Sequence, residues 1–217
     1  MLKITLLLCT FFVALQIYFE YRHHRGKPGP YVGITKTIAS AAFVIAAIFS
    51  DIFLASNGTT ILIGLLLCLV GDVFLISQKK LFFMMGLVSF LFAHIAYCVA
   101  FIAQTPYLVA LLIAAPALFA IGFTIGKWLL PKVGDNMKKP VAAYIITICC
   151  MVALSIGAAF ANHQWQLMVA AILFMISDIF VAKDRFIEST FLNRLFGLPL
   201  YYGAQLLFAT GHYWFPR

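Results

Sequence analysis

The sequence predicts an all-α, polytopic membrane protein, a bundle of eight transmembrane helices that forms a single integral membrane domain over residues 1–217. Of the 217 residues, 64% are hydrophobic and only 10% are charged, and the mean hydropathy is +1.03. Soluble domains are roughly half apolar and about a quarter charged, so this composition excludes an ordinary soluble domain. Because each membrane-spanning helix needs ~20 apolar residues, eight of them leave little chain for a separate extramembrane domain.

Eight apolar runs mark the expected helices in chain order. They are Leu2–Phe19, Ile34–Leu54, Thr60–Ile76, Leu81–Ala103, Tyr107–Ile125, Val141–Ala161, Leu167–Ala182 and Leu198–Tyr213. Each run is separated from the next by residues that favour loops. In order, these connectors are Tyr-Arg-His-His-Arg-Gly-Lys, Ser-Asn-Gly-Thr-Thr, Ser-Gln-Lys-Lys, Gln-Thr-Pro, the segment 127–139, Asn-His-Gln-Trp, and Ala-Lys-Asp-Arg through to Arg194.

Basic residues concentrate in the loops that follow the first, third, fifth and seventh runs. Twelve of the fifteen lie there: Arg22, Arg25, Lys27, Lys79, Lys80, Lys127, Lys132, Lys138, Lys139, Lys183, Arg185 and Arg194. The positive-inside rule places these loops in the cytoplasm and both termini on the other side, as expected for a bacterial inner-membrane protein. The same distribution argues against nucleic-acid binding, which the net charge of +8 would otherwise suggest.

The third and seventh runs resemble each other. Gly-Asp-Val-Phe-Leu at residues 71–75 and Ser-Asp-Ile-Phe-Val at residues 177–181 both precede a basic loop. Because four helices separate them, both segments cross the membrane in the same direction. This repeated pattern suggests two parallel four-helix halves. The alternative is a coincidental match between two short segments.

Charged residues inside membrane helices are costly and usually face a bundle interior. At ~1.5 Å per helical residue, Asp72 lies ~10 Å and Asp178 ~8 Å from the basic loops that follow them. Lys36 enters the second run from the same side, so the three charges are expected in one layer. Lys36 could instead snorkel to the headgroups, and either aspartate could simply pair with a neighbouring helix. Asp51 lies near the opposite end and is expected to be a solvated helix-end residue.

Polar side chains on other runs accompany that layer. They are Tyr144, Tyr201, Tyr202 and Gln205, with His94 and Tyr97 on the fourth run. The tyrosines could be interfacial anchors and His94 a helix–helix hydrogen-bonding group. The sequence contains no GxSxG, HExxH or P-loop motif, and its histidines and five cysteines lack metal-ligand spacing, so we expect neither a metal site nor a cofactor. A pair of carboxylates is suited to general acid–base catalysis.

Taken together and in this order, these residues resemble the lysoplasmalogenase family of YhhN-like membrane proteins. The resemblance covers nearly the whole chain, with one departure: Thr37 stands where family members often have proline. It is carried by Lys36, Gly71-Asp72 with Phe74-Leu75, Gly86, Phe90, His94, Tyr97, Phe101, Phe174, Ser177-Asp178, Tyr201-Tyr202 and Ala204-Gln205. The resemblance implies cleavage of the vinyl-ether bond of lysoplasmalogens, with Asp72 and Asp178 as the essential carboxylates.

The resulting hypothesis is an inner-membrane hydrolase whose partners are a lysophospholipid substrate and the surrounding lipid. One aspartate would protonate the vinyl ether and the other would stabilise the cation and activate water, with the assignment left open. Substrate would contact Lys36, as a phosphate ligand, and His94, Tyr97, Tyr144, Ser177, Tyr201, Tyr202 and Gln205. The alternatives are a small transporter with an aspartate proton relay and a non-catalytic lipid-binding protein. The sequence does not indicate the headgroup preference or the oligomeric state.

Overall fold

The structure, a computed structural model, describes residues 2–26, 30–77 and 79–214, and within them it contains eight α-helices and no strand. The helices are α1 (Leu2–His24), α2 (Tyr31–Phe49), α3 (Gly58–Phe74), α4 (Lys80–Ile102), α5 (Leu108–Leu129), α6 (Asp135–Asn162), α7 (Trp165–Phe186) and α8 (Phe191–Trp214). Two short 3-10 helices, η1 (Ile52–Leu54) and η2 (Leu130–Lys132), follow α2 and α5. The predicted all-α bundle of eight helices is confirmed.

Six of these helices are long and apolar enough to cross a membrane: α1, α2, α4, α5 extended by η2, α6 and α7. Helix α3 is apolar but has only 17 residues, and α8 carries the polar residues Asn193, Arg194 and Gln205 along its 24 residues. Large apolar side chains are exposed on the outer faces of the bundle, as expected where lipid replaces water as the solvent. The protein is an integral membrane protein.

Several helices extend beyond the apolar runs that predicted them. Helix α6 begins at Asp135 rather than Val141, and α8 begins at Phe191 rather than Leu198. The apolar run marks only the part of a helix that needs a lipid environment, whereas backbone hydrogen bonding continues into the polar residues at its end. The second run contains an interruption: α2 ends at Phe49, and the exposed Asp51 adopts a left-handed backbone conformation, with φ of 57°.

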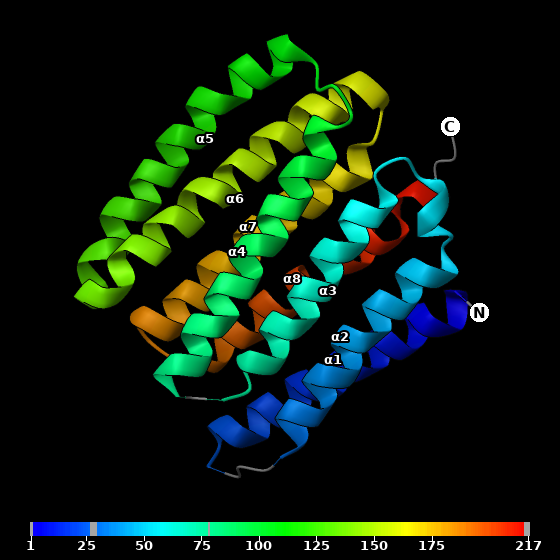
Figure 1. The fold of residues 1–217 in the computed structure, drawn as a ribbon. Coiled ribbons are helices and arrows are strands. Elements are labelled where there is room, and N and C mark those ends of the chain that lie inside the picture. Colours follow the sequence, from blue (N-terminus) through cyan, green and yellow to red (C-terminus); the bar gives the residue numbers. More distant parts are fainter. Residues whose placement is uncertain (1, 27–29, 78, 215–217) are drawn as a thin grey trace.

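The helices pack as two similar sets. Helix α2 contacts α1, α3 and α8, and α6 correspondingly contacts α5, α7 and α4. In Figure 1, α1 and α5 lie at opposite edges, and the pairs α3–α4 and α7–α8 form the centre. These contacts are the ones expected of two parallel halves, α1–α4 and α5–α8, but the likeness is partial, because α1 also packs on α8 whereas α5 makes no comparable contact with α4 in the described part of the chain.

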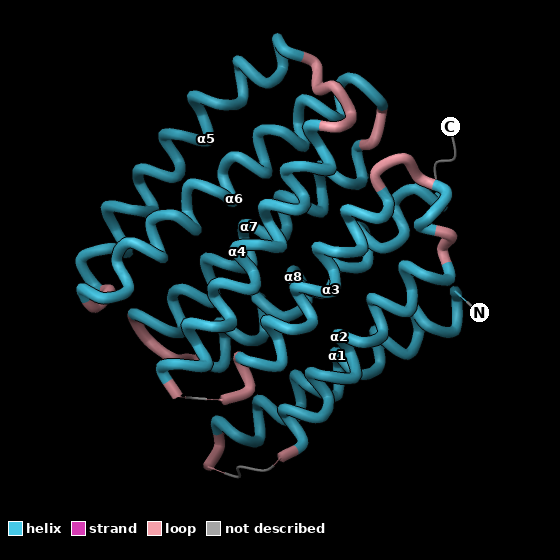
Figure 2. The backbone as a smooth tube through the Cα atoms, viewed as in Figure 1, coloured by secondary structure: helices cyan, strands magenta, loops and turns pink. Residues whose placement is uncertain are grey.

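One end of the bundle carries the four connections that follow α1, α3, α5 and α7, as the tube in Figure 2 shows. We call it the basic end, because most of the basic residues lie there. Helix α1 begins and α8 ends at the opposite end. Asp72 and Asp178 lie near the last turns of α3 and α7, so both belong to the part of the interior next to the basic end.

Close packing of α3 on α4 depends on Gly64, because a Cβ atom there would collide with the ring of Tyr97. We therefore expect Gly64→Ala to lower the thermal midpoint of the detergent-solubilised protein, with a cost of about 1–3 kcal/mol typical of overpacking. Gly203→Ala on α8 is the matched control, since no atom of the described residues lies within 4 Å of its added Cβ. Equal melting of both variants would contradict this account of the α3–α4 contact.

Candidate active site

Asp72, which is buried, and Asp178, which is partly buried, line one cavity of about 130 Å³, which we call the chamber. It lies between α4, α6, α7 and α8, and the side chains of Lys36, Tyr144, Ser177 and Tyr201 also face it. Most of the remaining lining is apolar, including Phe90, Ile145, Ile148 and Met175. A cavity of this size has room for several water molecules or for the reacting part of a lipid.

Asp72 is held by three groups from two other helices. Its Oδ1 lies 3.1 Å from the Nζ of Lys36, and its Oδ2 accepts hydrogen bonds of 2.6 Å from both Ser40 and Tyr201. Lys36 is only 8% exposed, so its ammonium group is buried against Asp72 and does not snorkel to the surface. A nearby ammonium and two hydroxyl donors all favour the ionised carboxylate.

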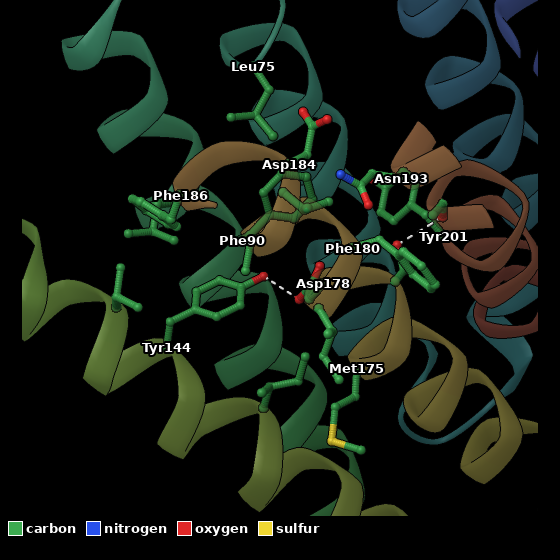
Figure 3. A pocket seen from close by; sticks show the side chains of 18 of the residues that line it. Leu75, Phe90, Tyr144, Met175, Asp178, Phe180, Asp184, Phe186, Asn193 and Tyr201 are labelled. Atoms are coloured by element: carbon green, nitrogen blue, oxygen red, sulfur yellow. Dashed lines mark hydrogen bonds between the residues drawn. The ribbon is translucent and has the colours of Figure 1, made fainter. Parts of the chain in front are cut away.

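Asp178 has different surroundings. The hydroxyl of Tyr144 donates a 2.6 Å hydrogen bond to its Oδ2, an interaction that Figure 3 shows within the chamber. The Nε2 of His94 lies 3.7 Å from the same oxygen. Among the residues that the structure describes, no lysine or arginine forms an ion pair with Asp178. The two aspartates thus share a cavity, but only Asp72 has a permanent cation beside it.

The tautomer of His94 follows from its other ring nitrogen. Nδ1 lies 2.7 Å from the carbonyl oxygen of Phe90, which can only accept a hydrogen bond, so Nδ1 carries the proton. In the neutral ring Nε2 is then an acceptor, and within the described part of the chain it has no hydrogen-bond partner. A fully buried, unsatisfied acceptor therefore faces Asp178.

Of the remaining candidates from the sequence, Ser177 lines the chamber, whereas Tyr202 and His94 lie outside its lining. Ser177 donates a hydrogen bond from its hydroxyl to the carbonyl of Gly197, which joins α7 to α8. The hydroxyl of Tyr202 is 3.3 Å from both the hydroxyl of Ser40 and the carbonyl of Lys36. It therefore supports the helix that carries Lys36.

Tyr97 and Gln205 lie outside the chamber lining. The Tyr97 hydroxyl donates to the Oε1 of Gln205 at 3.2 Å, and its ring stacks on Phe208 with centroids 4.2 Å apart. This pair connects α4 and α8. Tyr201 and Tyr202 are likewise buried hydrogen-bonding groups rather than interfacial anchors.

A second cavity of about 480 Å³, which we call the vestibule, adjoins the chamber at the basic end. The boundary residues that line both cavities are Lys36, Leu75, Phe83, Val181, Asp184 and Arg194. The vestibule also contains Glu20, His23, His24 and Arg185, so it is far more polar than the chamber. In Figure 3 the carboxyl group of Asp184 lies apart from that of Asp178. A polar compartment therefore lies next to the chamber that contains the two aspartates.

Sequence reasoning missed Ser40, Asp184 and Arg194. Ser40 lies four residues after Lys36, so it shares a helix face with that lysine, and this spacing was a usable signal. Asp184 on α7 and Arg194 on α8 lie at the ends of the segment 183–194, which the sequence predicted to be a loop and whose charges were interpreted only as topology markers. In the structure they form an ion pair of 2.7 Å.

Comparison with known proteins gives a consistent result. The sequence model of the YhhN family matches residues 31–212. The human protein lysoplasmalogenase TMEM86A is 31% identical over 159 residues, covering 70% of this chain and 65% of the human protein. Bovine lysoplasmalogenase TMEM86A is 26% identical over 211 residues, covering 93% of this chain and 86% of the bovine protein.

A second group of relatives is also similar. Mouse lysoplasmalogenase TMEM86B is 34% identical over 152 residues, covering 70% of this chain and 62% of the mouse protein. The alignments to the human and mouse proteins thus span slightly less than two thirds of those relatives. No solved structure matches this chain.

Proposed function

This chain belongs to the YhhN family, and we infer its function from that membership. We propose that it is a lysoplasmalogenase, a membrane hydrolase that cleaves the vinyl-ether bond of lysoplasmalogens to a fatty aldehyde and a glycerophosphodiester. The names of its relatives support this activity. The observation that carries the mechanism is that Asp72 and Asp178 line one chamber in contrasting electrostatic surroundings.

Asp178 is the proton donor in this proposal, and Asp72 is the ionised carboxylate. Asp72 keeps its negative charge because Lys36, Ser40 and Tyr201 all stabilise it. Asp178 lies in an apolar part of the chamber without such a cation, an environment that favours a neutral carboxylic acid. The unprotonated Nε2 of His94 beside it is a suitable partner for a carboxyl O–H.

The reaction then proceeds with each proton accounted for. Asp178 donates its proton to the β-carbon of the vinyl ether, and the resulting oxocarbenium ion is stabilised by the charge of Asp72. Water adds to the cationic carbon as Asp72 accepts one of its protons, which gives a hemiacetal. When the hemiacetal collapses, Asp72 returns its proton to the departing glycerol oxygen, and the hemiacetal hydroxyl proton passes to Asp178. Both carboxyl groups regain their starting states.

The apolar part of the chamber supports binding of the alkenyl chain. Ile145, Ile148 and Met175 line it on α6 and α7, next to Asp178. We propose that the chain extends along these residues while the glycerol faces the vestibule. We propose that the protein lies in the inner membrane of a bacterium, with the basic end in the cytoplasm and both termini on the other side of the membrane.

Hydrolysis by purified protein in detergent tests this function, since transport cannot be scored there. We expect release of fatty aldehyde from 1-alkenyl lysophosphoethanolamine, and no cleavage of the 1-alkyl ether or 1-acyl ester of the same headgroup. In D₂O the aldehyde, trapped at once by reduction, should carry one deuterium on the carbon next to the carbonyl, because solvent-derived acid protonates that carbon.

Two results would contradict the proposal. Equal cleavage of the acyl ester would indicate an esterase acting on lysophospholipids in general. Aldehyde without deuterium would exclude carbon protonation as the route to the product, whatever residues are involved.

A further inference from the structure

The vestibule contains charges of both signs that the proposed chemistry leaves without a role. Arg185 and Arg194 come from the α7–α8 region, and Glu20 comes from the last turns of α1. Contact between the rings of Tyr21 and Phe191, 5.2 Å apart, joins the end of α1 to the start of α8. The vestibule therefore brings together distant parts of the chain at the basic end.

The two arginines are held in place by the protein but keep free hydrogen-bond donors. Arg194 donates from one terminal nitrogen to Asp184 at 2.7 Å, and Ser189 binds the other oxygen of that carboxylate at 3.1 Å. The guanidinium group of Arg185 lies over the ring of Phe83, 4.3 Å from its centroid. Within the described residues, no further hydrogen bond uses their donors, so both arginines can bind a phosphate.

The position of the two arginines also favours phosphate binding. Arg194 and Phe83 belong to the boundary between the two cavities, so the arginines lie close to where a lipid would pass from vestibule to chamber. Lys36 is also at the boundary, but its ammonium group is paired with Asp72. A phosphate at the arginines would leave the glycerol and its ether oxygen directed toward the aspartates.

Glu20 supplies the opposite charge. Its carboxylate is partly buried, lines the vestibule and forms no ion pair or hydrogen bond with any residue that the structure describes. By contrast, both oxygens of Asp184 are occupied by Arg194 and Ser189. Glu20 is thus the vestibule carboxylate available to an incoming cation.

We propose that the vestibule is a headgroup subsite for a phosphoethanolamine zwitterion, in which Arg185 and Arg194 bind the phosphate and Glu20 binds the ammonium group. This inference rests on the proposed function for the identity of the lipid. It adds a specificity that vinyl-ether chemistry does not require, because the reacting bond is the same for every headgroup.

Binding measurements with lipids that cannot be cleaved test the subsite separately from catalysis. The probes are 1-O-alkyl lysophosphoethanolamine, 1-O-alkyl lysophosphoglycerol and 1-O-alkylglycerol, with Kd measured in detergent by microscale thermophoresis. We expect Arg185→Gln to weaken both phosphate-bearing lipids about tenfold and to leave alkylglycerol unchanged, since a charged hydrogen-bonding group is removed. Glu20→Gln should weaken only the phosphoethanolamine lipid.

Arg194 needs a compensated variant, because its removal alone leaves the partly buried Asp184 without a counter-charge. The double variant Asp184→Asn with Arg194→Gln should reproduce the Arg185→Gln result. Lys139→Gln is the control, since Lys139 is an exposed basic residue on α6 that lines none of the cavities described here.

Three outcomes would overturn the subsite: unchanged phosphate-lipid binding in Arg185→Gln, equal weakening of alkylglycerol, or equal effects of Glu20→Gln on both headgroups. Headgroup-selective binding without vinyl-ether hydrolysis would support the subsite and disprove the proposed function. Vinyl-ether hydrolysis without headgroup-selective binding would support the proposed function and disprove the subsite.

Discussion

Asp178→Asn is expected to lower kcat for vinyl-ether hydrolysis roughly 10³-fold, within the range for loss of a general acid. An amide has no acidic proton to give to carbon, so the first step is lost. The fold should remain intact, because the amide oxygen can still accept the hydrogen bond of Tyr144. Aldehyde release and the thermal midpoint, measured on the same preparation, separate these two effects.

Asp51→Asn is the matched control for Asp178→Asn. Asp51 is an exposed aspartate near the opposite end of the bundle, and its charge has no part in the proposed reaction. It should retain wild-type turnover. If Asp178→Asn also retained near-normal kcat, the acid assignment would be wrong even though membership of the family would stand.

Asp72→Asn should abolish activity and also destabilise the protein. The substitution leaves the ammonium group of Lys36, 8% exposed, without its counter-charge. Breaking one side of a buried ion pair typically costs 3–5 kcal/mol, so we expect a clearly lower thermal midpoint than for Asp178→Asn. The two aspartates thus differ in a property that can be measured without substrate.

A double variant separates the structural and chemical roles of Asp72. Replacing Lys36 with Met in the Asp72→Asn background removes the unpaired charge and should restore most of the lost stability. Activity should stay absent, because no carboxylate remains to accept the proton of water. Recovery of turnover in the double variant would show that Asp72 matters only as the partner of Lys36.

The sequence predicted the depth of the site well. Apolar runs give the position of each residue along its helix, so Lys36, Asp72 and Asp178 were correctly expected at one level. Depth is set by distance from a loop, which spacing in the chain measures directly. The same reasoning placed Asp51 near the opposite end, and in the structure it is exposed just beyond the end of α2.

The direction in which each side chain faces was harder to predict, because rotation about the helix axis is fixed by packing between distant segments. Tyr201 and Gln205 are one turn apart on α8, yet Tyr201 binds Asp72 whereas Gln205 binds Tyr97 outside the chamber. No local pattern distinguishes them. The vestibule was missed for the same reason, since it forms only when the end of α1 meets the start of α8.

The likeness of the two halves suggests how the proposed acid and base came to share one chamber. Lys36 on α2 contacts Asp72 on α3, and in the second half Tyr144, on the corresponding helix α6 but at a different position, contacts Asp178 on α7. Tandem duplication of a four-helix ancestor would have produced two identical carboxylates that compete for the same protonation state. Divergence of the neighbours, with Lys36, Ser40 and Tyr201 around one carboxylate and Tyr144 and His94 beside the other, would make the pair chemically complementary.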